Sequence, residues 1–287
     1  MRTTENRSES CLQEGRTSCR ALFVFLLPFL GAAGLLLSFL SMAGKPEELS
    51  GSVAVEHASG VPVGYILPSK LDGALVVKDT KAGDTVVARI TQEVPLPEKG
   101  KIALRSLVKG SIVAVTKDED EKGVGVTLRF DQLNDRGQSF SMATSLRALA
   151  SFNAVRDAET PRTGADGGSP SGWANTFQVG GDIRYGDGGI VRDGNREKVG
   201  KGVRGGVLVY LRPNPERGCE SPTRRDGHVQ ALWVFSANAC GVYGLTGVDI
   251  YNGESTHVGE FTLHFEKMDM KLVSGTGMLL AVVERPR

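Results

Sequence analysis

The feature of this sequence that most constrains its fold is the distribution of glycine. Of the 37 glycines, 23 lie between Gly164 and Gly277, among short runs of valine, isoleucine, leucine and aromatic residues. Glycine weakens helices and readily adopts the positive φ angles that tight turns between strands require. Disordered chains can be equally rich in glycine, but they lack such apolar runs. The second half of the chain is therefore predicted to form short strands joined by tight turns.

Strand patterns also fill residues 63–155. Apolar and polar residues alternate through 85–91, and glycine-containing turn signals such as Ala82-Gly83-Asp84 separate the runs. Closely spaced short strands without a helical period are typical of a small barrel or sandwich. Six strands are predicted here: 74–78, 101–104, 111–116, 124–133 and 138–142 in addition to 85–91. Residues 145–155 fit either a short helix or a final strand.

The predicted fold class is all-β, with two small barrel- or sandwich-like domains after an N-terminal hydrophobic helix. The first domain spans 63–155 and the second, glycine-rich domain spans 173–287. Residues 156–172 have a linker composition, residues 44–62 resemble a tether, and 180–206 are expected to be a mobile or turn-rich loop. Strands of the second domain are predicted at 176–179, 206–211, 230–236, 247–251, 259–265, 270–273 and 278–283.

An uncharged apolar segment occupies residues 21–43. Arg16 and Arg20 precede it, and Lys45-Pro46-Glu47-Glu48 follows it. A basic flank, an apolar stretch and a small-x-small sequence (Ser41-Met42-Ala43) indicate a secretory signal, although the run is also long enough to span a bilayer. We expect either a cleaved signal peptide or a retained membrane anchor. In both cases the chain after residue 44 is exported to the periplasm, the cell envelope or the extracellular space.

The four cysteines divide at this segment. Cys11 and Cys19 precede it, whereas Cys219 and Cys240 follow it, 21 residues apart with Pro222 and Gly227 between them. Disulfides persist in oxidising compartments, so Cys219 and Cys240 are predicted to form one. Two unrelated core thiols are the alternative.

Residues 79–142 resemble the C-terminal domain of TrbI-type conjugation proteins, which are scaffolds of type IV secretion channels. The resemblance is carried by 83–90, by 106–113, and by 127–133 with the turn Asp135-Arg136-Gly137. Ala103 and Arg105 stand where the family usually has proline and glycine. This resemblance implies a β-barrel-like fold and, as one alternative, a structural role in a secretion or conjugation complex. Residues 173–287 resemble uncharacterised exported proteins of Acidobacteria, which implies no activity.

Charge argues against nucleic acid as a partner. After residue 43 the chain has 30 Lys and Arg against 30 Asp and Glu, mixed along its length. Nucleic-acid binders instead concentrate positive charge to neutralise phosphates. The predicted partners are the membrane, through 21–43, and an envelope protein that pairs with an exposed β edge.

No catalytic or metal-binding motif emerges. The chain has no H-E-x-x-H or G-x-S-x-G sequence, and Ser274-Gly275-Thr276-Gly277 fits a turn between strands better than a phosphate loop. We therefore predict no catalytic residue, no cofactor and no metal. Loop acids could still form a glycosidase pair or a calcium site, although solvated turn residues are the preferred interpretation. The residues considered for these roles are the four histidines, His57, His228, His257 and His264, and the loop acids Asp182, Asp187, Asp193, Asp249, Glu254 and Glu260.

Trp233 and Tyr243 flank Cys240, together with Phe235. Core packing against a cystine is the preferred interpretation, and an aromatic platform that faces a sugar or peptide ligand is the alternative. The sequence thus predicts an exported bacterial envelope protein that acts as a non-enzymatic binding or assembly module. An extracytoplasmic carbohydrate-active hydrolase remains an alternative.

Overall fold

The structure, a computed structural model, describes residues 60–97, 100–118, 123–159, 178–181, 184–185, 189–193, 195–220, 228–252 and 257–285. All of these belong to one compact unit, Val55–Arg287. The predicted signal or anchor at 21–43 lies outside the described residues, as does the tether up to residue 59. Within the described ranges, no helix is long and apolar enough to cross a membrane.

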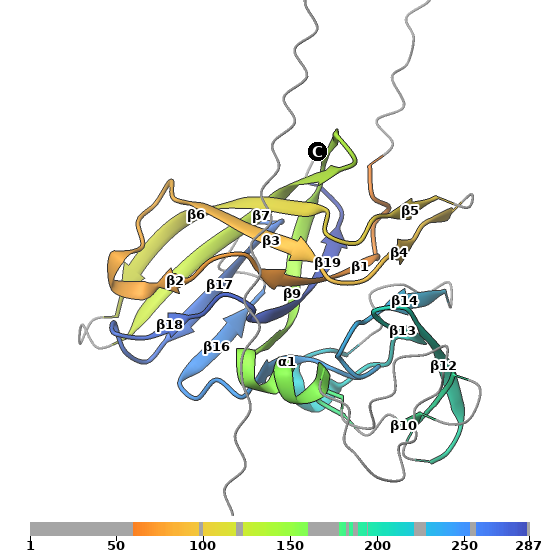
Figure 1. The fold of residues 1–287 in the computed structure, drawn as a ribbon. Coiled ribbons are helices and arrows are strands. Elements are labelled where there is room, and N and C mark those ends of the chain that lie inside the picture. Colours follow the sequence, from red (N-terminus) through yellow and green to blue (C-terminus); the bar gives the residue numbers. More distant parts are fainter. Residues whose placement is uncertain are drawn as a thin grey trace, which may run out of the picture. The chain divides into compact units, whose positions relative to one another are not determined.

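Ten strands form one large, nearly closed sheet (Figure 1). Neighbouring strands are antiparallel, except that β15 and β9 are parallel. The order is β15 (Gly241–Tyr243), β9 (Ala143–Ala150), β19 (Gly277–Val283), β1 (Ile66–Leu71), β3 (Thr85–Ile90), β6 (Leu107–Lys117), β7 (Val124–Asp135), β17 (Glu260–Phe265) and β16 (Val248–Tyr251), with β8 (Gln138–Ser141) paired to β7. The all-β, barrel-like prediction is confirmed.

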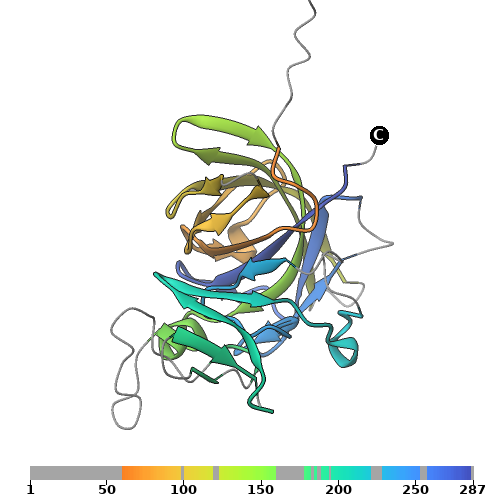
Figure 2. The ribbon, with the colours of Figure 1, turned by 90° about the vertical axis from the view of Figure 1, so that its right-hand side faces the viewer.

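A five-stranded antiparallel sheet and the α-helix α1 (Phe152–Glu159) pack on one side of the large sheet (Figure 2). The strands of this smaller sheet are β10 (Arg184–Tyr185), β11 (Ile190–Arg192), β12 (Lys198–Val203), β13 (Gly206–Tyr210) and β14 (Val229–Ala231). Two short ribbons complete the fold: β2 (Leu75–Val76) with β18 (Lys271–Leu272), and β4 (Val94–Pro95) with β5 (Lys101–Ile102). Short 3-10 turns occupy Val77–Asp79 and Pro215–Arg217.

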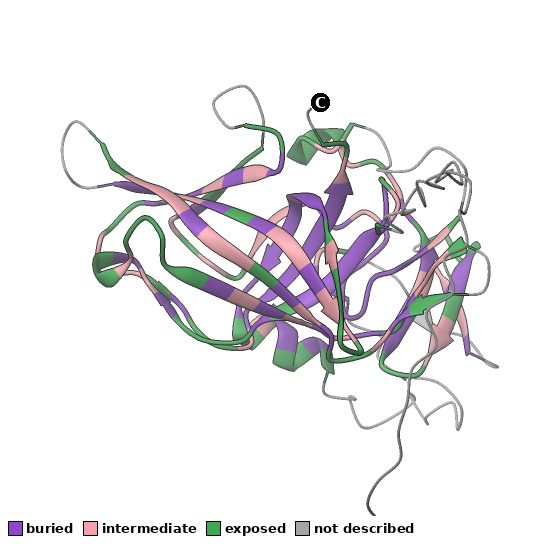
Figure 3. Ribbon diagram, turned by 90° about the horizontal axis from the view of Figure 1, so that it is seen from above, coloured by how far each residue is buried: buried purple, intermediate pink, exposed green. Residues whose placement is uncertain are grey.

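The inner face of the large sheet encloses the main hydrophobic core. Strands β3 and β17 alternate buried and less buried positions, as a half-buried strand should, and this alternation is visible along several strands in Figure 3. Phe130 of β7 and Phe261 of β17 stack inside with their ring centroids 6.2 Å apart. Val61 belongs to the same core, so the end of the predicted tether is already part of the folded unit.

A second core lies between the large sheet and the five-stranded sheet. Along β19, Leu280 faces the first core, whereas Leu279 faces the second. Burial on both faces explains why this strand reads as a continuous apolar run instead of an alternating one. Strands from before and after residues 156–172 share the large sheet and both cores.

Two buried glutamines connect the sheets. Gln92 Nε2 donates to the carbonyl of Val207 at 2.8 Å, and its Oε1 accepts the backbone N–H of Trp233 at 2.6 Å. Gln230 Oε1 accepts the backbone N–H of Ile66 at 3.1 Å. Each amide satisfies main-chain groups that burial would otherwise leave unpaired, so these side chains fix how the two sheets meet.

Two local predictions differ from the structure. The predicted loop 180–206 contains β11 and β12, because its glycines still provide backbone groups for a strand ladder, as in the pairing of Gly200 with Val209. The predicted linker begins inside α1, which extends to Glu159; the rest of the linker lies outside the described residues. The ambiguous segment 145–155 contains both alternatives, since β9 ends at Ala150 and α1 begins at Phe152.

Side-chain hydrogen bonds close the large sheet across its seam. Asn252 Oδ1 accepts the backbone N–H of Leu146 at 3.0 Å, while its Nδ2 donates to the Leu146 carbonyl at 2.7 Å. The amide thus replaces a strand residue opposite β9, at the point where β16 ends. Beside this contact, the Thr144 hydroxyl donates to the Phe130 carbonyl at 2.9 Å and joins β9 to β7.

The change N252D should open this seam. A carboxylate can accept the Leu146 N–H but cannot donate to its carbonyl, so two oxygens would face each other. We expect a loss of about 1–3 kcal/mol in the free energy of unfolding, measured by urea denaturation. The matched change N134D, at a half-buried position on β7, should cost less than about 0.5 kcal/mol. Equal losses for both variants would show that Asn252 does not close the barrel.

Candidate functional site

The strongest candidate site is a cavity of about 430 Å³ at the seam of the large sheet. Strands β15 and β16, the two ends of the sheet, lie side by side there without a ladder between them. The walls come from Leu146 and Arg147 of β9, from the end of β16, and from the turn that carries Cys219. The volume lies within the range of small-ligand pockets.

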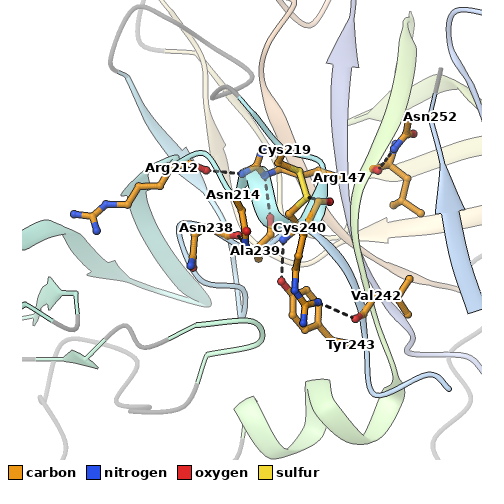
Figure 4. The surroundings of a disulfide bond; sticks show 12 residues. Arg147, Arg212, Asn214, Cys219, Asn238, Ala239, Cys240, Val242, Tyr243 and Asn252 are labelled. Carbon is orange, nitrogen blue, oxygen red and sulfur yellow. Dashed lines mark hydrogen bonds between the residues drawn. A yellow bond between two sulfur atoms is a disulfide. The ribbon is translucent and has the colours of Figure 1, made fainter. Parts of the chain in front are cut away.

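Arg147 lines this cavity, and Figure 4 shows its hydrogen bonds to the carbonyls of Ala239 and Arg212. On β19, Leu280 is opposite Leu146 and Leu279 is opposite Ala148, so Arg147 is the extra residue of a bulge. A bulge changes the direction of a side chain relative to the strand. The guanidinium donates from Nε to the Ala239 carbonyl at 3.0 Å and from Nη2 to the Arg212 carbonyl at 2.6 Å.

Arg147 carries a buried charge that has no acidic partner among the described residues. The residue is only 7 % exposed, and both described acceptors are neutral carbonyls. Burial lowers the pKa of Arg147 to about 10, with Tyr243 opposing this change, so the side chain is still protonated at neutral pH. A shift of that size corresponds to about 3 kcal/mol of unfavourable free energy for keeping the charge. An anion in the cavity would recover part of this cost.

A second cation, Arg217, stands at the cavity wall. Its guanidinium carbon lies 4.8 Å from the centroid of the Tyr243 ring, and Nη1 donates to the Val242 carbonyl at 3.4 Å. The Tyr243 hydroxyl in turn accepts the backbone N–H of Cys240 at 2.9 Å. The described lining contains both arginines and no aspartate or glutamate, so its electrostatic potential favours an anion.

The predicted disulfide between Cys219 and Cys240 is confirmed and lines the same cavity. Its Cα atoms are 6.2 Å apart, and it joins the turn after Arg217 to the start of β15. Asn214 strengthens this joint, because its Nδ2 donates to the Asn238 carbonyl at 3.0 Å. The disulfide therefore holds Arg217 and the Ala239 carbonyl in place around the cavity.

The two aromatic candidates have different positions. Trp233 is 3 % exposed and lies in the second core, where its ring is edge-on to Phe235 at 6.4 Å. It does not line the cavity. Tyr243 lies behind Arg217 and supports that guanidinium. The aromatic ring at the mouth is instead that of Tyr251, which is 52 % exposed.

The acids and histidines considered for chemistry are dispersed. Burial acts to raise the pKa of Asp193, but hydrogen bonds from the backbone of Glu197 and Asn195 and the ion pair with Arg212 at 2.6 Å lower it overall. Asp249 is exposed, and Glu260 lies near Arg129 at 3.6 Å. His264 Nε2 lies 2.9 Å from Asp118 on the outer surface.

The remaining candidates do not add a second site. His228 and His257 are exposed, while His57, Asp182, Asp187 and Glu254 lie outside the described residues. Ser274 and Gly275 lie in the turn between β18 and β19, and Gly277 begins β19. Within the described ranges, no cluster of three or more histidines, cysteines or acids could hold a metal ion.

Sequence reasoning missed both arginines of the cavity. The available signal for Arg147 was a single charge within the otherwise apolar end of β9, Leu146–Ala150. A charge in a strand buried on both faces requires a special partner or a function. For Arg217, the signal was its position two residues before a disulfide cysteine.

Comparison of the chain with known protein families, curated proteins and solved structures finds no match.

Proposed function

We propose that this chain is an exported bacterial envelope protein that works as a non-enzymatic binding module, and that the cavity beside Cys219 and Cys240 binds an anionic group. The observation that carries the proposal is the buried, protonated Arg147, whose described partners are neutral carbonyls. Buried charges normally have a counter-charge, so an unpaired one that lines a cavity favours an anionic ligand.

The export part of the proposal is supported by two independent features. Residues 21–43 form an uncharged apolar run after a basic flank, and the downstream cysteines pair in a disulfide. Structural disulfides belong to oxidising compartments. A hydrolase receives less support, because Asp193, Asp249 and Glu260 do not line the cavity.

Small anions should bind the full-length protein through the arginines. We expect phosphate, sulfate or acetate to bind in isothermal titration calorimetry at low salt. The change R217M should weaken binding by roughly tenfold or more, because a charge-assisted hydrogen bond contributes about 1.5–3 kcal/mol. R147M should weaken it further. Arg217 is exposed, so R217M tests the site even if R147M impairs folding.

The matched control is R89M. Arg89 is on the outside of β3, where it forms a surface ion pair with Asp72. This change also removes one positive charge, so it corrects for the net charge of the protein. The proposal fails if anions bind the R217M and R89M variants equally well, or if no anion binds the unmodified protein.

A further inference from the structure

The edge of β16 adds a second recognition element to the cavity. In the described part of the chain, the ladder of β16 pairs only with β17, and its opposite edge faces β15 across the seam. An unpaired strand edge presents alternating N–H and carbonyl groups. An inorganic anion cannot form hydrogen bonds with both kinds of group along the edge, whereas the main chain of an extended peptide can.

The free edge and the two arginines converge on one place. Ile250 and Tyr251 line the cavity from β16, with Asn252 directly after the strand, and Arg147 and Arg217 line it as well. Nη1 of Arg147 has no hydrogen-bond partner among the described residues. A group that presents both a strand-like main chain and a terminal negative charge would therefore satisfy both elements together.

We propose, on the basis of the proposed anion site, that the cavity binds the C-terminal end of an extended peptide, whose main chain pairs with the edge of β16 and whose carboxylate contacts Arg147 and Arg217. Strand addition to a free edge and capture of a terminal carboxylate are both established modes of peptide recognition. The half-buried Ile250 and the exposed Tyr251 give the cavity an apolar wall, so a terminal residue with an aliphatic side chain fits best.

The lining also argues for a peptide over a bare ion. Ile250 presents a half-buried aliphatic side chain, and Tyr251 presents a half-exposed ring at the mouth. An ion as small as phosphate would leave these surfaces without a contact. A peptide end uses the apolar wall, the strand edge and the charge simultaneously, and this combination gives specificity as well as affinity.

The test uses the full-length protein and an N-terminally fluorescein-labelled library of random heptapeptides with aliphatic C-terminal residues. Fluorescence anisotropy would compare the free carboxylates with the same peptides as C-terminal amides. We expect amidation to weaken binding roughly 30-fold or more, because it removes the partner of a buried charge. N-methylation of one main-chain nitrogen in the best binder should weaken binding roughly 3- to 10-fold.

The outcomes separate this inference from the proposed function. R217M should remove the difference between acid and amide, whereas R89M should preserve it. If phosphate or acetate binds through the arginines but free and amidated peptides bind alike or not at all, the peptide inference is wrong and the anion site stands. If no anion binds in an arginine-dependent way, both fail. Tolerance of N-methylation at every position would exclude strand pairing.

Discussion

Gly206→Ala should be among the most damaging single-methyl changes in the protein, with an expected loss of about 4 kcal/mol in the free energy of unfolding. A Cβ at Gly206 would overlap Gln92 Oε1 and lie 2.6 Å from the Cα of Trp233. The Trp233 contact is with backbone, so it cannot be relieved by rotating a side chain. Overpacking costs about 1–3 kcal/mol, and displacing Gln92 leaves the Trp233 N–H and the Val207 carbonyl unpaired at a similar cost.

Urea denaturation of G206A would measure this loss, and G73A is the matched control. A Cβ at Gly73 meets no atom within 4 Å, so this change should alter stability by less than about 0.5 kcal/mol. Adding Q92A to G206A should cost much less than the sum of the two single changes, because both act on the same contact. Additive losses would show that Gly206 and Gln92 are independent and that the joint between the sheets is elsewhere.

The same contact between the two sheets shows why the sharing of one large sheet by both halves of the chain could not be predicted from the sequence. The composition of residues 156–172 is that of a linker, but composition says nothing about which strands pair across it. Two signals were present: the continuous apolar run in β19, which predicts burial on both faces, and the two glutamines beside apolar strands. Neither identifies its partner, because Gln92 reaches residues more than 100 positions away in the chain.

Local strand prediction succeeded where alternation was strong, as in β3, β7 and β17. It failed where tertiary contacts decide the backbone. The predicted strand 230–236 ends at Ala231, although the residues after it are buried, because the chain leaves the ladder to donate the Trp233 N–H to Gln92. In the predicted loop 180–206, glycine was interpreted as a turn signal, yet Gly200 and Gly202 lie within β12.

The candidate site was predictable only in part. Compartment and cysteine spacing predicted the disulfide, which marks the position of the cavity. The direction of the Arg147 side chain depends on a bulge between β9 and β19. The strand register that creates this bulge is set by the closed sheet. The sequence shows that a charged residue stands in an apolar segment, but it does not show where the Arg147 side chain points or that its partners are neutral carbonyls.

Removing the disulfide is expected to cost about 3 kcal/mol, the chain-entropy estimate for a loop of this length. The double change C219S/C240S would be compared with the unmodified protein by urea denaturation. Because the bond also holds the turn that carries Arg217, anion affinity should fall in the folded variant as well. The matched control is C11S/C19S, which changes the two cysteines before the apolar run and should leave both quantities unaltered.

The same experiment bears on the compartment. If the full chain is expressed with residues 21–43 intact, we expect it in the envelope fraction, with Cys219 and Cys240 linked in non-reducing mass spectrometry. A loss of stability requires that the bond is present in the purified protein, so the mass spectrometry is carried out on cells lysed in the presence of a thiol-blocking reagent. Protein found in the cytosolic fraction with both thiols reduced, and C219S/C240S as stable as the unmodified chain, would refute the export proposal together with the structural role of the disulfide.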